Sequence, residues 1–179
     1  MGALTSQARH LALAIAVAVA AIGGVATAAQ LGQAAPELVG IEAWVNSQPQ
    51  SMVQLRGQVV LVDFWTFGCG NCINTLPHLR YWHERYRDRG LTVIGVHTPE
   101  FAHERDPAQL RAAVKRLKLP YAVAHDARSA SWSAWGVQAW PTLYLIDRQG
   151  HIVYRHIGEG NYAEIEARIR AALAALAAP

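Results

Sequence analysis

Two cysteines lie where a buried strand is predicted to end and a helix to begin. Residues Val59–Phe64 are nearly all apolar and β-branched, which is typical of a central parallel strand buried on both faces. Cys69 and Cys72 follow shortly afterwards, at the start of a segment that predicts a helix reaching Arg87. We expect the helix N-terminus to leave Cys69 exposed and to shield Cys72. This order of strand, CxxC and helix indicates a redox dithiol.

The chemistry of such a dithiol follows from its place on the helix. The helix dipole and the unpaired backbone N–H groups stabilise a thiolate at Cys69, which makes it the nucleophile. It attacks a disulfide of a partner, and Cys72 then attacks Cys69 to release the reduced partner. The same steps run backwards oxidise a dithiol, so the direction depends on the reduction potential.

Structural uses of the cysteines are disfavoured. A zinc site needs four ligands, usually with a second cysteine pair, and the chain has only two cysteines, with His78 and His83 further along the same helix. A disulfide that closes so small a ring restricts the unfolded chain little. With no phosphate-cradling glycine loop either, we expect no metal and no cofactor.

Length and charge limit the other classes. The 179 residues fit one domain with an appendage, and that domain can bury a core without staples. The net charge is +3, and no basic run with interleaved aromatic residues is present. Nucleic acid is therefore not an expected partner.

The first 28 residues predict export from the cytoplasm. Arg9 precedes an uncharged run, Leu11–Ala29, which contains the triplet Ala26-Thr27-Ala28 typical of a signal-peptide cleavage site. The run is also long enough to stay as an N-terminal membrane anchor. We expect residues 1–28 to be a signal peptide or an anchor, and the folded part to be periplasmic or otherwise extracytoplasmic. Membrane attachment is expected only if this segment is not cleaved.

The rest of the chain predicts a linker at 29–35 and one α/β domain at 36–177. Residues Val39–Gln54 form an N-terminal extension with strand-like pieces. The expected order is a mixed sheet with helices on both faces, a three-layer architecture. Strands are predicted at Val59–Phe64, Leu91–His97, Tyr121–Ala124, Thr142–Ile146 and Ile152–Ile157, and helices at Cys69–Arg87, Pro107–Lys118, Ala130–Trp135 and Tyr162–Leu176.

The residues around the dithiol carry a family resemblance. Asp63 stands six residues before Cys69, Trp65 lies between them, and Pro77 stands eight residues after Cys69. With Trp140-Pro141-Thr142 downstream, this pattern resembles the thioredoxin superfamily from about residue 36 to 176. The resemblance implies a thioredoxin-like fold.

The resemblance also implies roles for single residues. A buried Asp63 would have a raised pKa and accept the proton of Cys72, although a purely structural carboxylate is the alternative. Glu100 is expected near the same rim, where it either tunes Cys72 or is an ordinary exposed loop residue. Trp140-Pro141 is expected as a cis-proline loop. The expected substrate groove consists of Trp65, Gly70, Asn71, Trp140 and Pro141.

Within the superfamily, the chain resembles the extracytoplasmic TlpA type, and more narrowly the thioredoxin-like domain of DipZ-type proteins. The signal, the N-terminal extension and the helix Pro107–Lys118 suggest the first, and motifs such as Trp44-Val45-Asn46-Ser47 and His97-Thr98-Pro99-Glu100-Phe101 suggest the second. In DipZ-type proteins the domain follows a membrane electron conduit. The resemblance therefore implies a reductase of partner-protein disulfides that takes electrons from a membrane donor.

Three residues near the cysteines, and the cysteines themselves, define the departures and the alternatives. Asn71 keeps a backbone N–H where thioredoxin has proline, which predicts a somewhat more oxidising pair. Thr75 stands where cytochrome c maturation reductases carry glutamate, which disfavours that substrate. Thr66, three residues before Cys69, leaves open a peroxiredoxin-like peroxide reduction. Two cysteines could also bind Cu(I) in a non-catalytic carrier.

Overall fold

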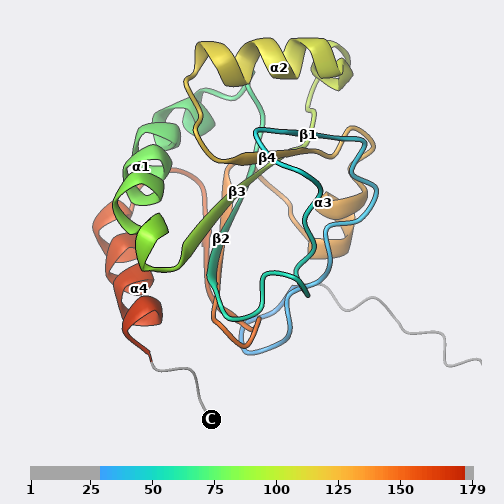
Figure 1. The fold of residues 1–179 in the computed structure, drawn as a ribbon. Helices are drawn as coiled ribbons and strands as arrows, with labels where there is room; N and C mark the ends of the chain where they lie inside the picture. The colour runs from blue at the N-terminus through green and yellow to red at the C-terminus, as the bar shows by residue number, and fades with distance from the viewer. Residues whose placement is uncertain (1–28, 176–179) are drawn as a thin grey trace, which may run out of the picture.

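A computed structural model describes residues 29–175 of the chain (Figure 1). The predicted signal peptide or anchor, 1–28, lies outside the described residues, as do the last residues of the predicted domain. Within the described part, no helix is both long enough and apolar enough to span a bilayer. The division of the chain into segment 1–28, linker and domain stays a prediction.

A six-stranded mixed sheet forms the centre of the fold, with the strand order β1-β4-β3-β2-β5-β6. The central strands β2, β3 and β4 are parallel, whereas β1, β5 and β6 run antiparallel to their neighbours. All seven residues of β2 are buried, as its continuous apolar run predicts. The strands are β1 (Ala43–Val45), β2 (Val59–Trp65), β3 (Leu91–His97), β4 (Ala122–His125), β5 (Thr142–Ile146) and β6 (Ile152–Ile157).

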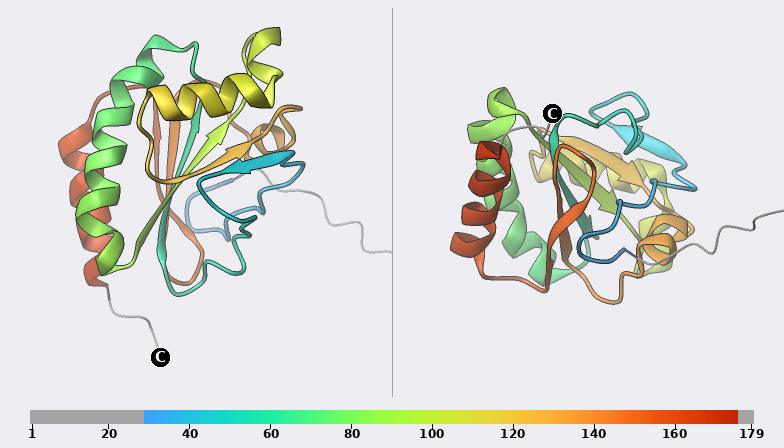
Figure 2. Two further views of the ribbon diagram at one scale, coloured as in Figure 1. Left: turned by 45° about the horizontal axis from the view of Figure 1, so that its top comes forward. Right: turned by 90° about the horizontal axis from the view of Figure 1, so that it is seen from below.

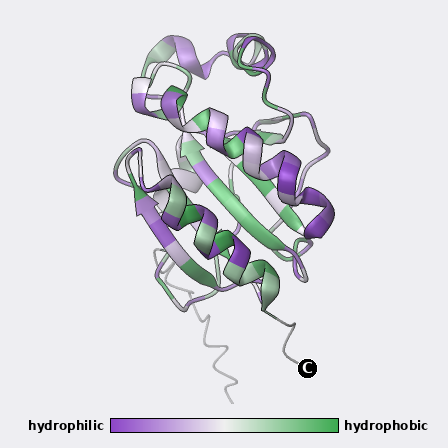
Figure 3. Cartoon of the chain, turned by 90° about the vertical axis from the view of Figure 1, so that its left-hand side faces the viewer, coloured by the Kyte–Doolittle hydropathy of each residue, from purple (hydrophilic) through white to green (hydrophobic). Residues whose placement is uncertain are grey.

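Helices cover both faces of this sheet, which confirms the predicted three-layer architecture (Figures 1 and 2). Leu61 faces a core built with α1, α2 and α4, whereas its neighbour Val62 faces a second core with α3 and the N-terminal segment. Figure 3 shows hydrophobic strands behind α1 and α4, with hydrophilic stretches on the helices in front. The helices are α1 (Gly70–Tyr86), α2 (Pro107–Arg116), α3 (Ala130–Trp135) and α4 (Tyr162–Ala174).

The ends of several elements differ from the predicted ones by one or two residues. Helix α1 begins at Gly70, because Cys69 is its N-cap with extended backbone. Helix α2 ends at Arg116. Lys118 has a φ of 53°, in the left-handed region, so the right-handed helix cannot continue through it. In the N-terminal extension, Ala43–Val45 forms the strand β1 at the edge of the sheet.

Residues 29–35, predicted to be a linker, lie against the β5–β6 hairpin. The Gly32 N–H donates to the Ile152 carbonyl at 2.8 Å, and the Ile152 N–H donates to the Gln33 carbonyl at 2.9 Å. The Ala35 N–H donates to the Gly150 carbonyl at 2.9 Å. This segment therefore extends the hydrogen bonding beyond β6.

Candidate active site

The dithiol and the cis-proline loop meet because of the strand directions. Strands β2 and β3 are parallel and end at the same edge, whereas the antiparallel β5 begins there, with Thr142 paired to Phe64. Cys69 follows the end of β2, and Trp140-Pro141 precedes the start of β5. Cys69 and Trp140, 71 positions apart in the chain, thus share one edge of the sheet, where sites of open α/β sheets usually lie.

The two cysteines differ in exposure as the sequence predicts. Cys69 is half-buried and caps α1, where its Sγ accepts the Cys72 backbone N–H at 3.3 Å. Cys72 is 1% exposed. Burial raises the pKa of the Cys72 thiol, and its hydrogen bond to Cys69 and the charge of Asp63 raise it further, against a lowering by the Thr66 backbone. Cys69 is thus the accessible sulfur, and Cys72 is held as a protonated thiol.

Asp63 lies under α1, in the interior of the fold. It occupies the same face of β2 as Leu61 and Trp65, which pack in the core that contains Cys72. The side chain is 1% exposed, and neither carboxylate oxygen has a hydrogen-bond partner among the described residues. Burial raises the pKa of Asp63 to about 8. A carboxyl group with that pKa can release and take up a proton near neutral pH.

The cis-proline loop is fixed against the neighbouring strand ends. The Trp140–Pro141 peptide bond is cis, which confirms the predicted loop. Trp140 Nε1 donates to the Thr98 carbonyl at 3.1 Å, and its ring lies 4.2 Å from that of Trp132 between centroids. The Thr98 hydroxyl in turn donates to Asp126 at 3.0 Å. The loop is therefore tied to β3 and to α3.

The residues predicted for the substrate groove differ in their accessibility. Gly70 and Asn71 are exposed beside Cys69, and Trp140 is half-buried. Pro141 is buried, and Trp65 is fully buried beneath the site. Of this set, Gly70, Asn71 and Trp140 offer surface to a partner, whereas Trp65 supports the site from inside. Their roles in partner binding stay predictions.

A buried carboxylate near the dithiol is Glu104, which the sequence reasoning missed. Glu100 itself is exposed, and its backbone N–H donates to Glu104 Oε2 at 2.7 Å. Glu104 caps the short 3-10 turn η2 (Ala102–Arg105) through the Phe101 N–H, and it also accepts the Gly68 N–H at 2.8 Å. The sequence offers no local signal for this cap, because the usual capping pattern has Ser or Thr where Phe101 stands. The role predicted for Glu100 stays a prediction.

The Thr66 hydroxyl, whose position before Cys69 left peroxide reduction open, lies in the core and contacts His97. It is fully buried and lies 3.2 Å from His97 Nε2. Burial and, to a smaller extent, the neighbouring His125 lower the pKa of His97 to about 3, so His97 is neutral. Among residues 29–175, no group of three or more His, Cys, Asp or Glu side chains is placed to hold a metal ion.

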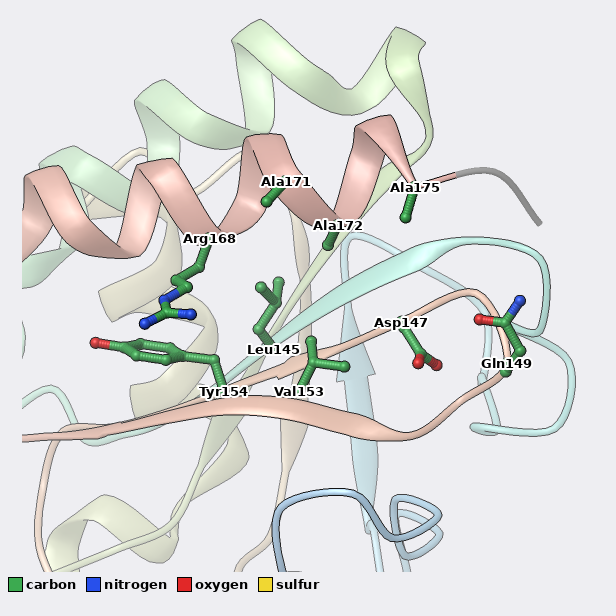
Figure 4. Close-up of a pocket in the computed structure, with 9 residues that line it drawn as sticks. All are labelled: Leu145, Asp147, Gln149, Val153, Tyr154, Arg168, Ala171, Ala172 and Ala175. Atoms are coloured by element: carbon green, nitrogen blue, oxygen red, sulfur yellow. The ribbon is translucent and has the colours of Figure 1, made fainter. Parts of the chain in front are cut away.

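A pocket on the surface lies away from the dithiol. A pocket of about 260 Å³ opens between α4 and the β5–β6 hairpin, with Arg168 above Tyr154 and with Leu145 and Ala172 among its walls (Figure 4). The part of β5 that lines the pocket is the end of the strand farther from Thr142. Cys69, Cys72 and Asp63 do not line it. The dithiol therefore lies outside this pocket.

Comparison with known proteins agrees with this geometry. The family model described as Redoxin matches residues 30–173. The chain is 41% identical over 139 residues to the protein DipZ of Mycobacterium tuberculosis, a match that covers 76% of this chain and 20% of DipZ. It is 25% identical to the thiol-disulfide oxidoreductase YkuV of Bacillus subtilis, over 81% of this chain and 97% of that protein. The chain thus spans about a fifth of DipZ and nearly all of YkuV.

A solved structure gives the fold independently. The thiol:disulfide interchange protein DsbE of Chlorobium tepidum superposes with a TM-score of 0.72 at 24% identity, over 82% of this chain and 99% of that one. This fold carries the half-buried Cys69, the shielded Cys72 and the cis-proline loop. The chain belongs to the Redoxin family and carries the CxxC pair Cys69–Cys72.

Proposed function

We propose that the protein reduces disulfides of partner proteins outside the cytoplasm and takes its electrons from a separate membrane reductase. The pattern of residues 1–28 supports the location. The similarity to DipZ supports the electron source, because the DipZ-type resemblance implies a membrane electron conduit. The open edge that carries the dithiol supports a protein as the substrate.

The observation that carries the proposal is the burial of Cys72 beside Asp63. The Cys69 thiolate attacks one sulfur of the partner disulfide, which forms a mixed disulfide and expels the other sulfur as a thiolate. Asp63 accepts the Cys72 proton, and the resulting Cys72 thiolate attacks Cys69. The partner leaves with two thiols once its thiolates are protonated, and the protein keeps the Cys69–Cys72 disulfide. Two electrons from the membrane reductase then restore the dithiol.

Trapping of the mixed disulfide tests this function. In a Cys72→Ser variant the resolving sulfur is absent, so we expect partner proteins to remain linked to Cys69 on non-reducing gels of the extracytoplasmic fraction. The matched Cys69→Ser variant keeps only the buried Cys72 and should trap none. A Cys72→Ser protein that traps no partner would contradict the proposal and favour peroxide reduction or Cu(I) binding instead.

A further inference from the structure

Glu104 links the entrance of the dithiol helix to the loop after β3. It is 0% exposed, and both of its oxygens are used. Oε1 accepts the Gly68 N–H at 2.8 Å, and Oε2 accepts the N–H groups of Glu100 and Phe101 at 2.7 and 2.8 Å. The second oxygen suffices to cap the turn at Phe101. The first reaches a residue 36 positions earlier in the chain, directly before Cys69.

The Glu104 carboxylate occupies the space that a side chain at position 68 would need. A Cβ at position 68 would lie 2.5 Å from Glu104 Oε1, closer than Cβ atoms approach other atoms. The backbone of Gly68 does not have the positive φ that itself favours glycine. The absence of a side chain at Gly68 therefore allows the carboxylate to approach the Gly68 N–H closely.

The hydrogen bonds keep Glu104 charged although it is buried. Burial alone would raise the pKa of Glu104. Hydrogen bonds from Thr66, Phe101, Glu100 and Gly68 outweigh it, and the pKa lies below the ordinary value. Charge-assisted hydrogen bonds to backbone N–H groups are roughly twice as strong as neutral ones. The contact to Gly68 is thus a strong local tie.

We propose that Glu104 is a positioning residue for thiol-disulfide exchange. By fixing the Gly68 N–H it holds the next residue, Cys69, at the N-cap of α1, where the sulfur accepts the Cys72 N–H at 3.3 Å. That placement stabilises the thiolate that attacks the partner. The inference rests on the nucleophilic role of Cys69 in the proposed function.

The test measures how fast Cys69 reacts with iodoacetamide across a range of pH, in full-length protein carrying Cys72→Ser so that one thiol remains. In Glu104→Gln the amide cannot accept all three N–H groups. We expect the rate at pH 7 to fall about tenfold and the pH of half-maximal rate to rise, because Cys69 leaves its place at the N-cap. A lower half-maximal pH would mean that the carboxylate acts only through its charge, and it would overturn the proposal, as would an unchanged profile.

A second variant breaks the same contact and keeps the charge. Gly68→Ala pushes a methyl group against Glu104 Oε1, so its pH profile should shift in the same direction as that of Glu104→Gln. Adding Glu104→Asp to Gly68→Ala shortens the acidic side chain and makes room for the methyl group. The double variant should react faster than Gly68→Ala alone. The proposal would be contradicted if the double variant reacted as slowly as the separate effects of Gly68→Ala and Glu104→Asp, added together, would predict.

Glu84→Gln is the control, because it makes the same change at an exposed position of α1. It should leave the profile unchanged. Urea unfolding of each variant shows whether it is folded during the reaction, and Gly68→Ala carries the test if Glu104→Gln is not. Alkylation requires no partner and no electron donor, so a failure of the proposed function does not affect this result.

Discussion

Asp63 is the residue at which folding and chemistry conflict most clearly. A carboxyl group with a pKa of about 8 and no hydrogen-bond partner among the described residues destabilises the folded state whenever it is ionised. A purely structural role would not require a titratable group at this position, since an apolar side chain would avoid that cost. Its position beside Cys72 supports the role of proton acceptor.

We expect Asp63→Asn to stabilise the protein at high pH only. The folded pKa of about 8 lies above the ordinary value of 3.8, so the wild type loses stability as the pH rises between these values and the variant does not. Asp63→Asn should therefore gain roughly 5 kcal/mol in free energy of unfolding at pH 8, relative to wild type, and nothing below pH ~4. Urea unfolding at several pH values measures the gain. An equal effect at both ends of the range would show that Asp63 does not titrate in this way.

Asn71 tests the effect of one backbone N–H on the dithiol. It follows Gly70 in the first turn of α1, where N–H groups lack helical partners. Asn71→Pro removes that donor and should make the pair more reducing, with about a tenfold change in the equilibrium constant against glutathione, or ~30 mV. Asn71→Ala keeps the N–H and should retain the wild-type potential. If both variants shift the potential equally, the side chain and not the N–H is responsible.

At the scale of the elements, Asp126 joins three parts of the site. Its carboxylate accepts the N–H groups of Ser131 and Trp132 at the start of α3, at 3.1 and 2.9 Å, and the Thr98 hydroxyl at 3.0 Å. Thr98 in turn holds Trp140 through its carbonyl. A single buried side chain thus fixes α3, the end of β3 and the cis-proline loop relative to one another.

Asp126→Asn should lower the free energy of unfolding by about 1–3 kcal/mol, because an amide has one oxygen for three donors. Chemical denaturation measures the loss. Asp88→Asn, the same change at an exposed position, should cost almost nothing. An Asp126→Asn protein as stable as Asp88→Asn would show that these hydrogen bonds do not stabilise the fold.

The element order was predictable because the local signals agree with the fold. The apolar run of β2 and the proline at the start of α2 mark elements that the structure confirms. Cys69 and Cys72 were found because their spacing and their place after a strand carry the information, and Asp63 was found through the resemblance to thioredoxins. Glu104 was not, because its contact with Gly68 joins residues 36 positions apart and nothing local separates it from an exposed loop glutamate. Trp65 was placed in the groove by resemblance, although its strand is buried on both faces.

At the scale of the whole molecule, the fold separates the reactive edge from the pocket. The dithiol lies where β2 ends and β5 begins, and the pocket of about 260 Å³ lies at the opposite end of β5 (Figure 4). A small-molecule enzyme usually places its reactive groups inside such a hollow. The exposed edge beside Cys69 instead suits two proteins that exchange a disulfide.

The reduction potential of the Cys69–Cys72 pair tests the account most directly. The purified protein is equilibrated against glutathione or dithiothreitol buffers, and its tryptophan fluorescence reports the redox state. A reductase fed by a membrane donor predicts a potential near that of thioredoxin, about −270 mV. A potential near that of a strong oxidant, about −120 mV, would contradict the reducing direction, and the absence of a reversible two-electron couple would contradict the dithiol itself.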